Sequence, residues 1–364
     1  MKRSYYIFSS GKLMRRQNTL FFLPYDEEEE LREQTSRTEE EPVDWQLITE
    51  AGEFKKEFDS LNKRVIPIDD VDSLMIFSEI NFNARMLQFL TKNNIPAHLF
   101  NYYGHYSGSY YPREYLLSGF LLVDQVEHYR QHKKRMRLAL LLVQGAAQNM
   151  LRNLKYYDGR AGDLSSFITQ IEQHLEQVPL ANDVQELMGL EGNIRQTYYQ
   201  AFPVILGDRY DFNKRVKQPP DNAVNALISF GNSMVYTTCL TEIYRTQLSP
   251  LISFLHEPGE RRYSLALDLA EIFKPLLADR VLFSCLNQKR IKHTDFNRDV
   301  NFCHLSKSGR KTFVKAYEDK LKTTIMHRKL DRKVSYRRLI RMECYKLVKH
   351  ITAAEPYEPF QAWW

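Results

Sequence analysis

Hydrophobic and polar residues alternate in short runs over the first hundred residues, and turn-forming or polar residues separate the runs. Alternation with a period of two is typical of half-buried β-strands. The strands that this pattern predicts cover residues 4–9, 19–23, 64–68, 73–77 and 95–100, and one helix is predicted over residues 83–93. We therefore expect a small β-rich N-terminal domain over residues 1–100.

The pattern changes after residue 113, where apolar residues recur at spacings of three and four. This spacing predicts amphipathic helices. They are expected at residues 114–126, 134–155, 163–177, 184–202, 223–247, 264–283, 308–321 and 335–351. The segment 101–113 between the two patterns is rich in Tyr, Gly and Ser, which predicts a linker. The expected fold class is α+β, with a small β-strand domain followed by a larger all-α domain over residues 114–364.

Charge is distributed unevenly along the chain. Residues 26–45 contain ten acids against two arginines, so we expect an exposed acidic insertion over about 26–59 in the first domain. Residues 289–349 contain nineteen Lys or Arg against six acids. Such a basic block often contacts the phosphates of nucleic acids, although a set of solvated helix faces would give the same composition.

Composition and cysteine spacing argue against several classes of protein. With 43% hydrophobic and 26% charged residues, the chain has the composition of a soluble globular protein. It has no apolar run near the roughly 20 residues of a spanning helix and no signal peptide, so a cytoplasmic location without membrane contact is expected. The cysteines form no CxxC pair, which favours reduced buried thiols over zinc ligands or disulfides. They are Cys239, Cys285, Cys303 and Cys344.

Two polar residues stand out in the helical part. Glu191 lies between Gly189 and Gly192, before a helical run from Asn193. It could act in catalysis or be an acid at a helix N-terminus, where the helix dipole favours negative charge. His256 ends an apolar run just before a turn, and such a histidine is often a hydrogen-bonded core or capping residue.

Asp268 and Glu271 are three residues apart and so share one helix face. Leucine, isoleucine and phenylalanine cover most of that helix, so both acids are expected to be buried. Buried carboxylates need a proton, a partner or a metal. Together with Glu191 and His256 they would form a mixed oxygen and nitrogen site suited to Mg²⁺ or Mn²⁺, with the histidine favouring Mn²⁺. In phosphoryl transfer such a metal polarises the phosphodiester and activates a hydroxyl.

These motifs resemble the CRISPR-associated integrase/endonuclease family of the adaptation (spacer acquisition) module, close to the subtype I-B branch. The likeness extends over nearly the whole chain. The stretches that carry it are YYIFSSGKLMRRQNTL (5–20), IPIDDVDSLMIF (66–77), NYYGHYSGSYYPREYLLSG (101–119), GLEGNIRQTYY (189–199), PPDNAVNALISFGNSMVY (219–236), FLHEPGERRYSLALDLAEIFKP (254–275) and VSYRRLIRMECYKLVKH (334–350).

The resemblance implies that Glu191, His256 and Glu271 are ligands of a Mg²⁺ or Mn²⁺ ion, with Asp268 as the second acid of the same helix. It implies a homodimer formed by the β-strand domain, a helical catalytic domain, and a small ferredoxin-like partner that completes a heterohexameric integrase. The implied reaction joins the 3′-hydroxyl ends of protospacer DNA to a CRISPR repeat by transesterification.

The resemblance also assigns the basic block to double-stranded DNA. The candidate phosphate contacts are Lys289, Arg290, Lys292, Arg298, Arg328, Arg332, Arg337 and Arg341. Three features depart from the family pattern: the long acidic insertion, Asn232 in place of a common aromatic residue, and Lys274 in place of a frequent arginine. None of them is in the implied ligand set.

Other aromatic and imidazole groups are expected to be structural. The tyrosines of the linker could stack on bases, but packing at a domain interface is favoured. They are Tyr102, Tyr103, Tyr106, Tyr110 and Tyr111. His98, His105 and His128 are expected to be ordinary hydrogen-bonded residues. Two alternatives to the integrase stay open, namely a metal-dependent nuclease of branched DNA with the same ligands, and a non-catalytic basic DNA-binding scaffold.

Overall fold

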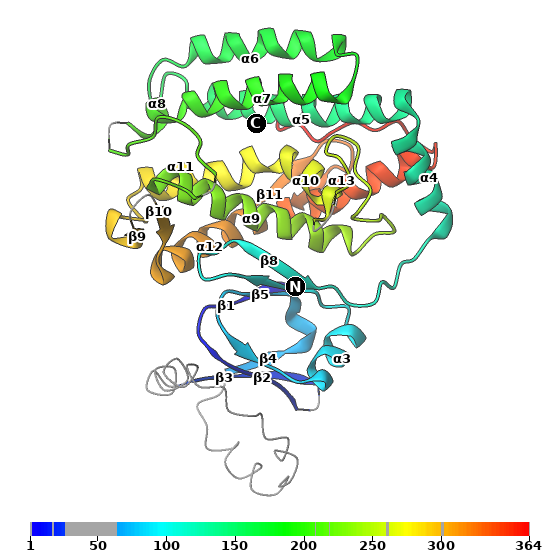
Figure 1. Cartoon of the computed structure of the whole chain (residues 1–364), viewed down its shortest axis with the longest axis vertical. Coiled ribbons are helices and arrows are strands. Elements are labelled where there is room, and N and C mark those ends of the chain that lie inside the picture. Colours follow the sequence, from blue (N-terminus) through cyan, green and yellow to red (C-terminus); the bar gives the residue numbers. More distant parts are fainter. Residues whose placement is uncertain are drawn as a thin grey trace, which may run out of the picture. The chain divides into compact units, whose positions relative to one another are not determined.

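The computed structural model describes residues 2–16, 18–25, 64–207, 209–217, 219–259, 262–299 and 302–363. Its contacts divide the chain into two compact units (Figure 1). The first contains Met1–Tyr102 and Tyr106–Tyr115, and the second contains Tyr103–His105 and Leu116–Trp364. The acidic insertion expected over residues 26–59 lies outside the described residues.

Two four-stranded sheets form the first unit. One has the order β1 (Arg3–Ile7), β5 (Val71–Ile76), β7 (Ala97–Phe100) and β8 (Tyr106–Tyr110), in which β8 alone runs antiparallel to its neighbour. The other has the order β4 (Arg64–Pro67), β3 (Thr19–Pro24), β2 (Gly11–Arg16) and β6 (Ile80–Asn81). In this sheet β2 pairs antiparallel with β3 and parallel with β6.

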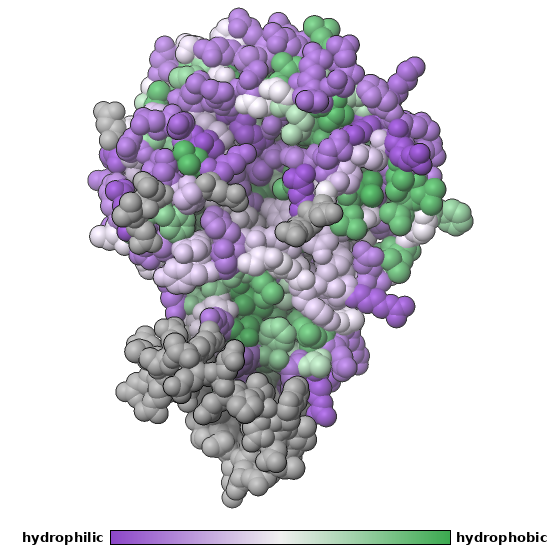
Figure 2. Space-filling model, in the orientation of Figure 1, coloured by the Kyte–Doolittle hydropathy of each residue, from purple (hydrophilic) through white to green (hydrophobic). Residues whose placement is uncertain are grey.

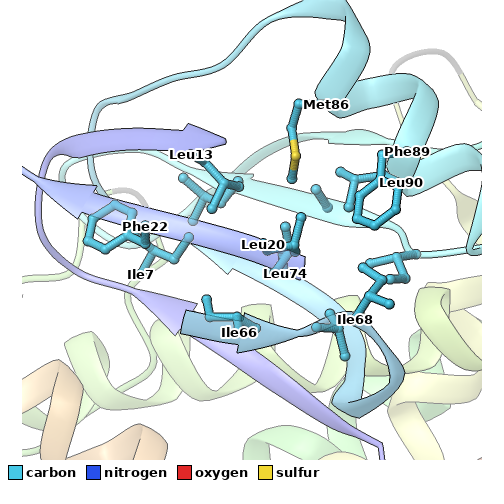
Figure 3. Close-up of a cluster of buried hydrophobic side chains, with 14 residues drawn as sticks. Ile7, Leu13, Leu20, Phe22, Ile66, Ile68, Leu74, Met86, Phe89 and Leu90 are labelled. Atoms are coloured by element: carbon cyan, nitrogen blue, oxygen red, sulfur yellow. The ribbon is translucent and has the colours of Figure 1, made fainter. Parts of the chain in front are cut away.

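The two sheets and the helix α3 (Ala84–Lys92) share one hydrophobic core (Figure 3). Alternate residues of β3, Leu20 and Phe22, point into it, as the period of two predicts. Met86 and Phe89 of α3 cover the same core. The helix begins after Asn83, whose side chain accepts a hydrogen bond from the backbone N–H of Met86 (3.1 Å).

The expectation of a linker over residues 101–113 needs correction. The segment contains β8, which pairs with β7 through most of its length. The hydroxyl of Tyr110 donates to the backbone oxygen of Leu87 (3.0 Å), so this tyrosine packs within the first unit. Three residues of the segment, Tyr103–His105, instead belong to the second unit.

The second unit is mainly helical, as predicted. Its helices are α4 (Gly119–Arg130), α5 (His132–Tyr157), α6 (Ser165–Gln177), α7 (Val184–Gln200), α8 (Phe202–Leu206), α9 (Ala223–Ile243), α10 (Ser264–Lys274), α11 (Arg280–Asn287), α12 (Lys307–Lys322) and α13 (Tyr336–Ile351). The long helix α5 packs against both α7 and α10, and α10 also packs against α9. The helix α5 therefore holds α7 and α10 in place.

Two details of the second unit differ from the prediction of an all-α domain. Short antiparallel pairs occur between the helices, β9 (Phe296–Asp299) with β10 (Phe302–Leu305) and β11 (Thr324–His327) with β12 (Arg332–Ser335). The single helix predicted over residues 264–283 is interrupted by a π-helical turn, Pro275–Asp279, because Pro275 has no backbone N–H to donate.

Surface and thiol chemistry agree with a packed globular fold. All four cysteines are free and buried, as predicted. No helix among the described residues is both long and apolar enough to cross a membrane. Most of the visible surface of the second unit is hydrophilic, and a hydrophobic patch appears beside α4 (Figure 2). Phe120 and Val123 of α4 are exposed large hydrophobic residues.

Candidate active site

Residues from two helices and a loop line one cavity in the second unit. Glu191 comes from α7, Glu271 from α10 and His256 from the loop between α9 and α10. All three line a cavity of about 920 Å³. They meet because α7 and α10 both pack against α5, although 80 residues separate the two glutamates in sequence.

Glu191 lies in the interior of α7. The helix begins at Val184, where the side chain of Asp183 accepts a hydrogen bond from the backbone N–H of Glu186 (2.8 Å). Glu191 is therefore about two turns inside the helix. The sequence left open that Glu191 is an acid at the N-terminus of a helix that begins at Asn193. This alternative is wrong, because α7 begins at Val184.

Arg195 bridges the two glutamates of the site. Its Nε donates to Oε1 of Glu191 (2.8 Å), and its Nη2 forms an ion pair with Oε2 of Glu271. Lys274 binds the other oxygen of Glu271 (2.7 Å). Burial would raise the pKa of Glu271, but the charges of Arg195 and Lys274 outweigh it and hold that pKa well below its usual range. Glu271 is therefore ionised at neutral pH.

Asp268 holds the ring of His256. Its carboxylate is fully buried and lies 2.8 Å from Nδ1 of His256. It also accepts hydrogen bonds from the backbone N–H groups of Phe254 (2.7 Å), Leu255 (3.0 Å) and His256 (3.0 Å). Burial favours the neutral ring, but the hydrogen bond and charge of Asp268 raise the pKa of His256. With Nδ1 engaged, Nε2 is the ring nitrogen left to bind a ligand.

Side chains of α4 and α5 fix the backbone of the loop that carries His256. Arg135 of α5 donates through Nε to the backbone oxygen of Phe254 (2.9 Å) and forms an ion pair with Glu257 (2.6 Å). Gln125 of α4 donates to the backbone oxygens of Ser249 (2.9 Å) and Ile252 (2.7 Å). The imidazole of His256 is thus carried by a loop tied to three helices, α4, α5 and α10.

Cationic side chains that the sequence analysis did not single out also line the cavity. Lys214 and Lys217 flank Arg215, which donates to Oδ1 of Asn225 (3.0 Å) and Oγ of Ser229 (2.9 Å). Burial lowers the pKa of Arg215. In the sequence, only the basic run NKRVK at residues 213–217 could have indicated these cationic side chains. The cavity is therefore suited to a polyanionic ligand.

The basic block divides into exposed and structural residues. The exposed candidates are Lys289, Arg290, Lys292, Arg298, Arg328 and Arg332. Arg337 instead pairs with the buried Glu318 (2.8 Å), and Arg341 pairs with the fully buried Glu242 (2.6 Å). Arg337 and Arg341 therefore take part in ion pairs within the helical unit. None of the eight candidates lines the cavity.

The segment Tyr103–His105 also contributes to the site. The ring of Tyr103 packs edge-on against Phe302 (4.6 Å between centroids) and His304 (5.3 Å). His105 lines the cavity. The sequence predicts an ordinary hydrogen-bonded residue at His105, since nothing in its neighbours along the chain links it to Glu191 or His256.

The chemical types of the donor groups of Glu191, Glu271 and His256 suit a hard divalent cation. Two carboxylates and an imidazole whose second nitrogen is fixed by a carboxylate are ligands of Mg²⁺ or Mn²⁺ sites. Among the described residues no group of three or more His, Cys, Asp or Glu side chains is arranged to hold a metal ion. Arg195 connects Glu191 and Glu271, so its guanidinium supplies positive charge between them. A metal would have to displace this guanidinium.

Comparison with known proteins adds independent evidence. A family model described as "CRISPR associated protein Cas1" matches residues 46–319. The CRISPR-associated endonuclease Cas1 of Fusobacterium nucleatum is 44% identical over 100% of this chain and 98% of its own length. A protein named CRISPR-associated endonuclease Cas1 3, from Thermodesulfovibrio yellowstonii, is 46% identical over 100% of both chains.

A solved structure agrees with the sequence matches. The structure of a Cas1 protein from Thermotoga maritima superposes with a TM-score of 0.80 at 36% identity, and the match covers 98% of this chain and 99% of that one. Identity at this level over whole chains, together with a common fold, establishes common family membership. The chain belongs to the Cas1 family of CRISPR-associated proteins.

Proposed function

We propose that this chain is a divalent-metal-dependent DNA integrase and endonuclease of CRISPR adaptation, which joins the 3′-hydroxyl ends of protospacer DNA to a CRISPR repeat by transesterification. One observation carries the proposal: Glu191, His256 and Glu271 line a single cavity whose remaining charged side chains are all Lys or Arg. The names of the relatives, CRISPR-associated endonucleases, support nuclease chemistry at this site.

In this proposal Glu191, Glu271 and Nε2 of His256 hold a Mg²⁺ or Mn²⁺ ion, and Asp268 orients the imidazole. When bound, the ion would supply Lewis-acid polarisation of the phosphodiester and would promote ionisation of the attacking hydroxyl. The side chains of Lys214 and Lys217 would bind DNA phosphates and hold the reacting ends in line. No external energy source is needed, because one phosphodiester bond replaces another.

The assembly that we propose follows the family resemblance. The β-sheet unit would form a homodimer, and a small ferredoxin-like partner would complete a heterohexameric integrase. Both duplexes, protospacer and repeat, would lie along basic surfaces that include the exposed candidates of residues 289–332. Counterion release from these phosphate contacts would make DNA affinity fall steeply with salt.

A strand-transfer assay tests the proposal. The protein and its small partner are mixed with a short duplex bearing free 3′-hydroxyls and a plasmid bearing a repeat, with Mn²⁺ or with EDTA. We expect covalent joining that needs the metal and is lost in Glu191→Ala and His256→Ala, while both variants keep DNA binding. Strand transfer at the wild-type rate by His256→Ala would refute the assignment of the site.

The endonuclease name of the relatives favours one competing function, cleavage of branched DNA as the main activity. The same ligands would serve it, since hydrolysis and joining differ in the attacking hydroxyl. The product separates the two functions, because a nuclease gives shortened strands without a joined product. DNA binding without covalent chemistry under any metal would instead favour a non-catalytic scaffold.

A further inference from the structure

The cavity contains a second imidazole besides that of His256. His105 lines the same cavity as the glutamates and comes from the segment Tyr103–His105. This segment is part of the second unit, although the strands before and after it belong to the first. Neither the metal ligand set nor the basic block of the proposed function uses this residue.

Close packing fixes the backbone next to His105. Gly104 has a φ of +83°, and a Cβ built on it would lie 2.8 Å from Cδ2 of Phe230. Only glycine adopts this conformation and fits this space without displacement. On the other side, Tyr103 packs against Phe302 and His304. The imidazole of His105 is therefore presented to the cavity from a fixed backbone rather than from a free loop.

The surroundings of His105 favour its neutral form. Burial lowers the pKa of His105, and the positive charge of Arg215 and the ring of His304 lower it further. A neutral imidazole can accept a proton. The other titratable side chains that line the cavity are Glu191, Arg195, Tyr199, Lys214, Arg215, Lys217, His256, Glu271 and Lys274.

We propose that His105 is the catalytic base of the joining reaction and takes the proton of the incoming 3′-hydroxyl. This inference rests on the proposed integrase function. As the hydroxyl oxygen bonds to the target phosphorus, the bond from that phosphorus to the target 3′-oxygen breaks. The departing oxygen takes a proton from water, and the imidazolium of His105 returns its proton to water. The reaction thus has no net proton change.

Three variants test this role in the complete protein with its partner and metal. His105→Ala should lower the strand-transfer rate by about 10²- to 10⁴-fold, which is the usual range for loss of a general base, with DNA affinity unchanged within about twofold. Added imidazole should restore part of the rate of His105→Ala. The wild-type rate should rise with pH as the base loses its proton, and His105→Ala and His105→Gln should both lack this rise.

A glycine pair separates positioning from general damage to the fold. Gly104→Ala should slow joining because the new Cβ forces the backbone beside His105 away from Phe230. Gly108→Ala is the matched control, since a Cβ at Gly108 meets nothing within 4 Å. It should join DNA at the wild-type rate. Thermal unfolding of both variants verifies that the comparison is made between folded proteins.

The outcomes distinguish this inference from the function on which it rests. A wild-type protein that makes no joined product overturns both. Joining by the wild type together with an unchanged rate and pH profile in His105→Ala overturns the role of His105 alone. A His105→Gln protein that matches the wild type while His105→Ala is slow would also overturn it, because a hydrogen bond without proton transfer would then suffice.

Discussion

At the scale of single residues, Asp268 connects the stability of the site with its chemistry. One buried carboxylate accepts three backbone N–H groups and fixes Nδ1 of His256. Asp268→Asn replaces one acceptor oxygen by a donor that faces these N–H groups. Under the proposed function, in which His256 is a metal ligand, we expect metal affinity and strand transfer to fall by about 10- to 100-fold, the usual effect of losing the partner of a ligand histidine.

Thermal unfolding and a metal titration of strand transfer check this prediction. The matched variant is His256→Ala, which should lose joining but keep the hydrogen bonds that the backbone N–H groups of the loop donate to Asp268. Asp268→Asn should therefore unfold at a lower temperature than His256→Ala. An Asp268→Asn protein with the stability and metal requirement of the wild type would contradict the assigned role.

Asp279 makes stability depend on pH. Burial raises its pKa from an ordinary 3.8 to about 7, and its carboxyl accepts a hydrogen bond from Tyr198 (3.1 Å). Between about pH 4 and pH 7 the carboxyl of Asp279 keeps its proton in the folded state but loses it in the unfolded chain. The contribution of Asp279 to the free energy of unfolding is therefore full below about pH 4 and is lost as pH rises to about 7. Asp279→Asn should remove this loss, since the amide oxygen can still accept from Tyr198.

Urea unfolding of the wild type and Asp279→Asn at pH 5 and pH 8 measures the effect. The free energy of unfolding of the variant minus that of the wild type should be larger at pH 8 than at pH 5. Equal differences at the two pH values would show that Asp279 does not titrate with a raised pKa.

At the scale of elements, a buried ion pair joins α13 to α9. Glu242 is fully buried between Arg245 (3.1 Å) and Arg341 (2.6 Å). Arg341→Ala leaves this carboxylate with one cation, so we expect the free energy of unfolding to fall by about 2 kcal/mol, somewhat less than for complete loss of a buried pair. Chemical denaturation gives the value.

Arg332 is the matched control, because it is exposed on β12. Arg332→Ala should change the free energy of unfolding by less than about 0.5 kcal/mol. If it contacts DNA, it should also reduce the slope of log affinity against log salt by about 1. A large loss of stability in Arg332→Ala, or none in Arg341→Ala, would contradict this division of the basic block.

The elements that sequence predicts well are those with several repeats of a period. The helix α5 and the strand β3 follow their apolar patterns closely, whereas α9 is buried on nearly all sides. The strands of the two short pairs in the helical unit are not predicted, because their sequences FNRD, FCHL, TIMH and RKVS do not alternate between apolar and polar residues. β8 was missed because its YSGSY sequence has no alternation of apolar and polar residues.

At the scale of the whole molecule, the site could be predicted only in part. Resemblance indicated Glu191, His256 and Glu271, and the burial of Asp268 followed from its apolar neighbours. The bridge made by Arg195 and the presence of His105 in the cavity depend on how distant segments pack, which one sequence without a template does not specify. The resemblance therefore predicts a ligand set, but nothing along the chain predicts the groups around it.

The segment after α13 is part of the support of the site. Asn149 of α5 donates to the backbone oxygens of both Ile272 (2.9 Å) and Phe360 (3.0 Å), which ties α10 and this segment to one side chain. The rings of Phe273 and Phe360 stack with centroids 5.8 Å apart. Tyr357 donates to the buried Glu343 (2.6 Å).

Removal of residues 355–364 should therefore weaken the second unit selectively. Asn149 and Glu343 would lose buried partners, and Phe273 would lose its packing. We expect the unfolding transition of the helical unit to move to lower temperature and that of the β-sheet unit to stay in place. Calorimetry resolves the two transitions, and a common shift of both would contradict this prediction.

The same contacts set an order of events during synthesis. Chains emerge from the ribosome with the N-terminus first, at about 5–20 residues per second. The helix that carries Asp268 and Glu271 is made about ninety residues before Phe360, whose ring stacks on Phe273 of that helix. Ala362 follows two residues later and donates its backbone N–H to Oδ1 of Asn149 (2.8 Å). A nascent or prematurely terminated chain thus lacks the last contacts that support the candidate site, and the site is completed only after translation has passed these residues.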